Sequence, residues 1–202
     1  MKKLYFKYGA MNSGKTYEIL RTAHNYEENG YKVMIVKPFC DKKGDNSVVS
    51  RVGLSRKVDI LLKEDEYVSS FIEKDVPTVI LVDEAEFFTK EQIDDLLFIT
   101  RKFNIDVFCY GLKTDFRTNA FPGAIRLFEL CDKIEEMSTL CKCGEKANHN
   151  LRFVDDVPVF DGDQVAIDGF SNVTYRPVCS NCYINYYEEA NQKGLVRKKI
   201  FK

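Results

Sequence analysis

One segment near the start of the chain has the residue types and spacing of a phosphate-binding loop. Residues 9–16 read Gly-Ala-Met-Asn-Ser-Gly-Lys-Thr, which matches the pattern Gly-x-x-x-x-Gly-Lys-Thr/Ser. In such a loop, backbone N–H groups turn towards a polyphosphate, and the helix that follows presents its positive end. Lys15 would contact the β- and γ-phosphates, and the Thr16 hydroxyl would coordinate Mg²⁺. A simple glycine turn is the alternative, but it explains neither the strand-like residues before the loop nor the helix-like residues after it.

Two adjacent carboxylates follow an apolar segment further along the chain. Residues 79–82 read Val-Ile-Leu-Val and lead directly into Asp83 and Glu84. Neighbouring side chains of an extended chain point in opposite directions, so we expect the two acids to have different roles. Asp83 would stabilise Mg²⁺, directly or through water, and Glu84 would accept a proton from an attacking hydroxyl or water. An ordinary exposed strand end is the other interpretation. The predicted nucleotide-binding residues are Gly9, Ala10, Met11, Asn12, Ser13, Gly14, Lys15, Thr16 and Asp83, with Thr16 and Asp83 at the metal.

Four cysteines in the last third of the chain form two pairs. Cys141 and Cys143 flank one lysine, and Cys179 and Cys182 follow after 35 intervening residues. Four thiolates suit a tetrahedral, structural zinc site, and a complete cysteine shell leaves no position for a substrate. The first pair is one residue shorter than the usual Cys-x-x-Cys, so a site with His149 in place of Cys141 is the alternative.

The elements that would position these residues follow from the hydrophobic pattern. Strand-like segments cover residues 4–8, 33–36, 78–82, 107–110 and 133–137, and helix-like segments cover residues 15–28 and a stretch that begins at Thr89. Their alternation predicts a parallel sheet covered by helices. Thr89 and Gln92 have the spacing of a capping box at the start of the second helix.

Two parts of the chain depart from this alternation. Residues 39–57 are polar and too long for an ordinary connection, so we expect a lid loop there. After about residue 140, cysteines and Gly/Asp clusters replace the alternating pattern. The sequence therefore predicts an α/β nucleotide-binding domain over residues 1–139 and a small zinc-binding domain over residues 140–202.

Composition limits the class of partner. The 30 Lys and Arg residues nearly balance the 31 Asp and Glu residues, so the overall charge favours neither nucleic acid nor an anionic membrane. No apolar segment approaches the roughly 20 residues of a membrane span, and the first residues lack the pattern of a cleavable signal. Seven cysteines, an odd number, favour reduced thiols and metal binding. We expect a cytosolic protein whose ligand is a small molecule.

Taken in order, the motifs resemble those of the zinc-containing, cytosolic type of thymidine kinase. The set comprises the loop at 9–16, Asp-Glu-Ala-Glu-Phe-Phe at 83–88, the segment 111–121, and the two cysteine pairs with Tyr175 before the second. The resemblance implies a RecA-like P-loop core and a small domain whose "lasso" loop closes over a base. It implies transfer of the γ-phosphate of ATP to the 5′-hydroxyl of thymidine or deoxyuridine, giving the monophosphate and ADP. A homotetramer inhibited by thymidine triphosphate (dTTP) is implied as well.

The resemblance also assigns residues to the nucleoside. Glu84 matches the catalytic base. The residues that match the nucleoside pocket and its lasso are Met11, Leu112, Phe116, Phe121, Val165, Ala166, Ile167, Asp168, Gly169 and Tyr175. Residues 165–169 would read the pyrimidine edge through their backbone groups. Core packing is the other interpretation for Phe116 and Phe121, and packing within the zinc-binding domain is the other one for Tyr175.

Four features depart from the family's pattern, and one of them is the loop over residues 168–175, which is slightly longer than usual. Glu86 stands where glutamine is usual, and the first cysteine pair lacks one residue. The lid reads Asp41-Lys42-Lys43 where Asp-x-Arg is usual. Lysine lacks the guanidinium fork, so a phosphate clamp at this position would be weaker.

Two other functions fit parts of the pattern. One is a P-loop ATPase or GTPase whose zinc ribbon binds nucleic acid or protein, with Glu84 activating water. The absence of an Asn-Lys-x-Asp motif and the balanced charge argue against it. The other is a structural zinc-ribbon protein with a degenerate nucleotide site, which the presence of Lys15, Thr16 and both acids makes a poor fit.

Overall fold

The computed structural model describes residues 1–41, 46–72, 76–164 and 172–196. The chain divides into two compact units. Unit 1 comprises Met1–Tyr8, Gly14–Lys113 and Phe121–Met137. Unit 2 comprises Gly9–Ser13, Thr114–Ala120 and Ser138–Lys202, so it includes two short segments that precede residue 138. The first of these segments is most of the phosphate loop.

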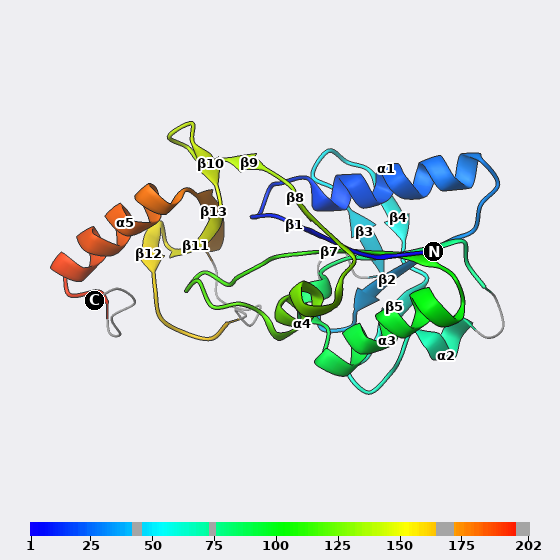
Figure 1. Ribbon diagram of the computed structural model, residues 1–202. Coiled ribbons are helices and arrows are strands. Elements are labelled where there is room, and N and C mark those ends of the chain that lie inside the picture. Colours follow the sequence, from blue (N-terminus) through cyan, green and yellow to red (C-terminus); the bar gives the residue numbers. More distant parts are fainter. Residues whose placement is uncertain (42–45, 73–75, 165–171, 197–202) are drawn as a thin grey trace. The chain divides into compact units, whose positions relative to one another are not determined.

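Unit 1 is built on a parallel six-stranded sheet with the order β5-β2-β6-β7-β1-β8. Its strands are β1 (Leu4–Tyr8), β2 (Val33–Pro38), β5 (Ile60–Leu62), β6 (Val79–Val82), β7 (Asp106–Gly111) and β8 (Lys133–Glu136). Its helices are α1 (Lys15–Glu28), α2 (Ser69–Ile72), η1, a 3₁₀ helix (Ala85–Phe87), α3 (Lys90–Lys102) and α4 (Pro122–Leu130). In Figure 1, α1 lies on one side of the sheet and α3 on the other.

Both faces of the sheet are covered, because alternate residues of the central strands belong to different core clusters. Ile35 of β2 and Leu81 of β6 cluster with Ile19 of α1. Their neighbour Val36 clusters instead with Leu96 of α3. This two-residue alternation explains why β2 and β6 are buried along their whole length.

The segment expected as a lid loop contains regular structure. Strands β3 (Ser47–Val49) and β4 (Ser55–Lys57) pair as an antiparallel hairpin. Ser50 stabilises the connecting turn, because its hydroxyl both donates to the Leu54 carbonyl and accepts from the Leu54 N–H. Lys42 and Lys43 lie outside the described residues.

The described residues of unit 2 form small antiparallel sheets and one helix. Strand β11 (His149–Val154) pairs with β12 (Val157–Val159) and with β13 (Val173–Val178), and β9 (Thr139–Leu140) pairs with β10 (Lys146–Ala147). Helix α5 (Ser180–Gln192) packs Tyr183 and Tyr187 into a core that also holds Leu151 and Phe153 of β11. No helix in the described part of the chain has the length and apolar character that crossing a bilayer requires.

Most predicted elements of unit 1 are confirmed. The segments at 4–8 and 15–28 are β1 and α1, and the other predicted strands differ from β2, β6, β7 and β8 by one or two residues at their ends. The capping box is confirmed as well: Thr89 Oγ1 accepts from the Gln92 N–H at 3.2 Å, and Gln92 Oε1 accepts from the Thr89 N–H at 3.0 Å.

Candidate functional site

The phosphate loop joins β1 to α1, the order that a phosphate-binding loop requires. Its backbone turns at Asn12 and Gly14, whose φ angles are 68° and 82°. Glycine adopts such an angle without steric cost, and Gly14 immediately precedes the first residue of α1. That first residue is Lys15, which is buried. The loop therefore places Lys15 and Thr16 at the positive end of a 14-residue helix.

Two N–H groups of the loop already have protein partners within unit 2. The Met11 N–H donates to Asn150 Oδ1 at 2.8 Å, and the Ser13 N–H donates to the Ala10 carbonyl at 3.2 Å. The Asn12 carbonyl also accepts from Thr139 Oγ1 at 3.3 Å. The predicted inward turn of successive N–H groups therefore does not describe Met11 and Ser13, whose N–H groups help to shape the loop.

Three carboxyl groups cluster after the end of β6. Asp83 is only 5% exposed, and its Oδ1 accepts the Glu84 N–H at 3.1 Å. Glu84 is half-buried, and its φ angle of 49° is unusual for a residue with a side chain. Because Glu84 is not extended, the strand alternation that we used to separate the roles of the two acids does not apply to it. The third carboxyl belongs to Glu86, in the 3₁₀ helix η1.

Thr16, Asp83 and Glu84 line one small pocket within unit 1, with a volume of about 10 Å³. The pocket is also lined by Lys37, Asp41 and residues 47–49. Lys37 is fully buried, and its Nζ lies 2.9 Å from the Asp41 carboxylate. A hydroxyl and carboxylates around a space for about one water-sized particle form a donor set that suits Mg²⁺.

The electrostatics of this cluster also favour a cation. Burial raises the pKa of Asp83 to about 7, and the nearby Glu84 charge contributes to the rise. The pKa of Glu86 is raised well above its usual value for the same two reasons, while Lys15 opposes both shifts. A divalent cation beside Asp83 would reverse the effect of burial and favour the ionised carboxylate.

In unit 2, Arg152 of β11 joins two of the predicted nucleoside-binding residues. Its guanidinium carbon lies 3.7 Å from the centre of the Phe116 ring, and its Nε donates to the Tyr175 hydroxyl at 2.8 Å. Its Nη2 donates to the Gln164 carbonyl at 3.3 Å. Arg152 is only 6% exposed. Sequence reasoning missed this residue, although a single arginine between Leu151 and Phe153 was a signal that its charge would need internal partners.

The other predicted nucleoside-binding residues lie in different surroundings. Phe121 is buried in the core of unit 1, where its ring meets that of Phe87 edge to face at 5.4 Å. Leu112 packs against the same core and is partly buried. The predicted residues Val165, Ala166, Ile167, Asp168 and Gly169 lie outside the described part of the chain.

The four cysteines of the predicted zinc site come together. The sulfur atoms of Cys141, Cys143, Cys179 and Cys182 all lie within 4.8 Å of one another. The Cys143 and Cys179 sulfurs are 3.6 Å apart, close to the spacing of about 3.8 Å expected when sulfurs bind a tetrahedral ion at about 2.3 Å. The geometry therefore favours the four-cysteine set.

His149, the alternative ligand, is engaged elsewhere. Its Nε2 lies 3.1 Å from the Ser180 hydroxyl, and its ring packs against that of Tyr183. The metal-binding group that the described residues form contains the four cysteines and does not include His149.

Comparison with known proteins reveals extensive similarity. A family model described as thymidine kinase matches residues 2–183. The chain is 43% identical over 189 residues to a thymidine kinase of Streptococcus pyogenes serotype M3 (strain ATCC BAA-595 / MGAS315), an alignment that covers 92% of this chain and 98% of the relative. It is 42% identical, with the same coverage, to a thymidine kinase of Streptococcus agalactiae serotype Ia.

Proposed function

The chain belongs to the thymidine kinase family, and on this basis we propose that it transfers the γ-phosphate of ATP to the 5′-hydroxyl of thymidine or deoxyuridine. The products are dTMP or dUMP and ADP, so the reaction serves the salvage of pyrimidine deoxynucleotides for DNA synthesis. One observation carries the proposal beyond family membership. The candidate base Glu84 and the candidate metal-binding residues Thr16 and Asp83 line the same pocket.

The residues of unit 1 have distinct roles in this proposal. Thr16 and Asp83 would hold Mg²⁺, which, when bound with ATP, neutralises charge on the phosphates. Lys15 contacts the β- and γ-phosphates from the start of α1. Glu84 accepts the proton of the 5′-hydroxyl as the oxygen attacks phosphorus. We expect this proton transfer to accelerate the reaction by about 10²–10⁴-fold.

Recognition of the nucleoside is assigned largely to unit 2. The contacts of Arg152 with Phe116 and Tyr175 support this, because one buried guanidinium holds both aromatic side chains in place. Met11 and the backbone of 165–169 complete the proposed contacts to the nucleoside and its base, and Leu112 and Phe121 remain proposed nucleoside-binding residues. A base whose donors and acceptors are mismatched would leave buried polar groups unsatisfied, which provides selectivity.

The zinc ion is proposed as a structural cofactor. The mutual distances of the four cysteine sulfurs support it, and bound zinc would add roughly 10–16 kcal/mol of apparent folding free energy to a small region.

We further propose a cytosolic homotetramer with dTTP as feedback inhibitor. The functional division is an ATP-binding domain over 1–139 and a zinc-binding domain over 140–202. The balanced charge is our reason for assigning neither a nucleic acid nor a membrane partner.

The rate of ADP formation from ATP tests the proposal. We expect ADP formation to require thymidine or deoxyuridine and to be insensitive to DNA and RNA. Turnover stimulated by nucleic acid, with no effect of thymidine, would instead indicate a P-loop ATPase whose zinc ribbon binds a macromolecule.

A further inference from the structure

Glu86 is a buried carboxyl close to the proposed base. It is the middle residue of η1, which begins directly after Glu84. The residue is only 1% exposed, and neither Oε1 nor Oε2 accepts a hydrogen bond from a donor among the described residues. An ionised carboxylate in such a position would lose its hydration without compensation, which is strongly unfavourable. The surroundings therefore favour the neutral acid.

Strand β7 and helix α4 approach η1 through glycines. A Cβ atom at Gly111 would lie 2.5 Å from Oε2 of Glu86, so the carboxyl group rests directly against the backbone of β7. A Cβ atom at Gly123 would lie between 2.6 and 2.8 Å from carbonyl oxygens of Ala85, Glu86 and Phe88. These approaches fix η1 between two backbone segments and define where the Glu86 carboxyl lies.

Two charged groups act most strongly on Glu86. Burial is the largest cause that raises its pKa, and the Glu84 carboxylate is the next, through its charge and, more weakly, through contact between the carboxyl groups. Lys15 acts in the opposite direction. Two neighbouring carboxyl groups in a buried site commonly hold one proton between them, since ionising both places like charges together.

We propose that Glu86 is a positioning residue, held as a neutral carboxylic acid whose O–H donates a hydrogen bond to the Glu84 carboxylate. This inference rests on the proposed function, because it gives the proposed base a partner. The bond would orient the Glu84 side chain. The proton of Glu86 stays on Glu86 during the reaction, and the proton released by the 5′-hydroxyl goes to Glu84.

Infrared spectroscopy tests the protonation state without any enzyme assay. At pH 7.5 we expect a C=O stretching band of a protonated carboxylic acid that shifts in D₂O and loses most of its intensity in Glu86→Gln, where only the partly protonated Asp83 contributes. The matched control is Glu91→Gln, which alters an exposed glutamate of α3 and leaves the band intact. If the wild-type protein lacks this band, the proposal is wrong, whether or not the protein phosphorylates thymidine.

Kinetics separate hydrogen bonding from packing. Methionine at position 86 fills the buried space without a donor, whereas glutamine retains one. We expect kcat of Glu86→Gln to be at least about tenfold above that of Glu86→Met, because only the methionine variant loses the hydrogen bond to the charged Glu84. KM for ATP should agree within about twofold between the two variants. Equal kcat values in two folded variants would overturn the inference. If Glu86→Met does not fold, the infrared band decides. An inactive wild-type protein would contradict the proposed function and leave the infrared result standing.

Discussion

The backbone N–H of Met11 donates a hydrogen bond to Oδ1 of Asn150 over a distance of 2.8 Å. Met11 belongs to the phosphate loop, and Asn150 lies 139 residues later in β11. Asn150 is buried, and its strand also carries Arg152. Within unit 2, the shape of the loop therefore depends on the same strand that holds Phe116 and Tyr175.

Replacing Asn150 by alanine removes the acceptor of the Met11 N–H. We expect a loss of about 1–3 kcal/mol in the free energy of unfolding, since the bond is lost at a buried site, and a severalfold rise in KM for ATP. Denaturant unfolding and steady-state kinetics measure both effects. The control is Asn25→Ala on the exposed face of α1, which we expect to change neither quantity appreciably. If the two variants behave alike, the bond does not shape the loop.

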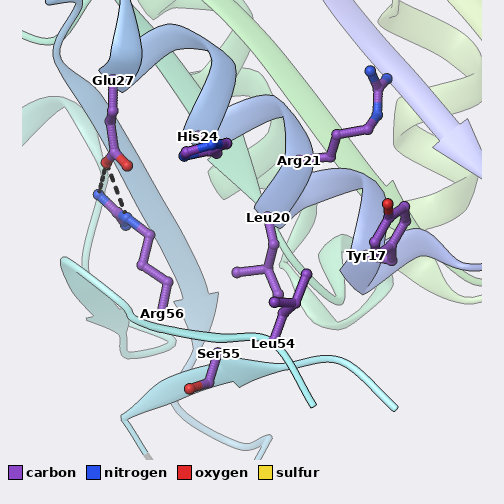
Figure 2. Close-up of a pocket in the computed structure, with 8 residues that line it drawn as sticks. All are labelled: Tyr17, Leu20, Arg21, His24, Glu27, Leu54, Ser55 and Arg56. Atoms are coloured by element: carbon purple, nitrogen blue, oxygen red, sulfur yellow. Dashed lines mark hydrogen bonds and ion pairs between the residues drawn. The ribbon is translucent and has the colours of Figure 1, made fainter. Parts of the chain in front are cut away.

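Arg152→Lys tests the arrangement around Phe116 and Tyr175. Lysine retains the charge but cannot lie flat on the Phe116 ring while donating to two oxygens. We expect KM for thymidine to rise about tenfold, because the substitution removes one to two hydrogen bonds near the proposed nucleoside site. KM for ATP should stay within about twofold. The control is Arg21→Lys, which alters a half-exposed ion pair; Figure 2 shows Arg21 on α1. An equal change in both KM values would show that Arg152 does not act on nucleoside binding specifically.

Zinc content and stability test the cysteine cluster. We expect one zinc ion per chain, lost in Cys179→Ser and retained in Cys40→Ser, because Cys40 is an exposed thiol outside the cluster. Chelation should lower the melting temperature and abolish thymidine binding, since the zinc supports the core of unit 2. Soluble, active protein that contains no zinc would contradict this prediction.

Glu86 makes the stability of the protein depend on pH. Its pKa is raised in the folded state by burial and by Glu84, against the opposing charge of Lys15. Above its unfolded pKa of about 4.5, the folded state therefore binds more protons than the unfolded state, and stability falls as pH rises. Glu86→Gln removes this dependence. We expect the melting temperature of the variant, measured relative to that of the wild type, to rise as the pH increases from 5 to 8. A difference in melting temperature that does not change with pH would contradict the raised pKa of Glu86.

Glu84→Gln tests the proposed base. Because the amide cannot accept the hydroxyl proton, we expect kcat to fall about a hundredfold or more, with ATP affinity within a few fold. Nucleotide titration and single-turnover kinetics distinguish the two quantities. Unchanged turnover would remove Glu84 from this role.

Much of unit 1 was predictable because its signals are local. The β-branched segments, the phosphate loop and the Thr89 capping box each lie within a few residues, and the structure has them at the expected positions. Strand β5 was missed because three residues carry almost no periodicity, and the hairpin β3–β4 was hidden in a polar segment. Helix α5 was missed because it buries tyrosines, Tyr183 and Tyr187, in an otherwise polar sequence.

The site was less predictable because its contacts join distant parts of the chain. The motifs point to Asp83 and Glu84 by position, but the backbone angle of Glu84 depends on how β6 passes into η1. Sequence reasoning marked Glu86 as unusual, yet its burial arises from the close approach of Gly111 and Gly123. Likewise, nothing local to Arg152 reveals that its partners are Phe116 and Tyr175.

The most direct test of the central claim is a screen of nucleosides as acceptors of the labelled γ-phosphate of ATP. Purified protein with Mg²⁺ is incubated with each nucleoside, and the labelled product is identified by chromatography, with Glu84→Gln as the matched control. We predict label on the 5′-position of thymidine or deoxyuridine, little or none on cytosine or purine nucleosides, and a loss of about a hundredfold in the variant. Label released only as inorganic phosphate, at a rate independent of any nucleoside, would contradict the account.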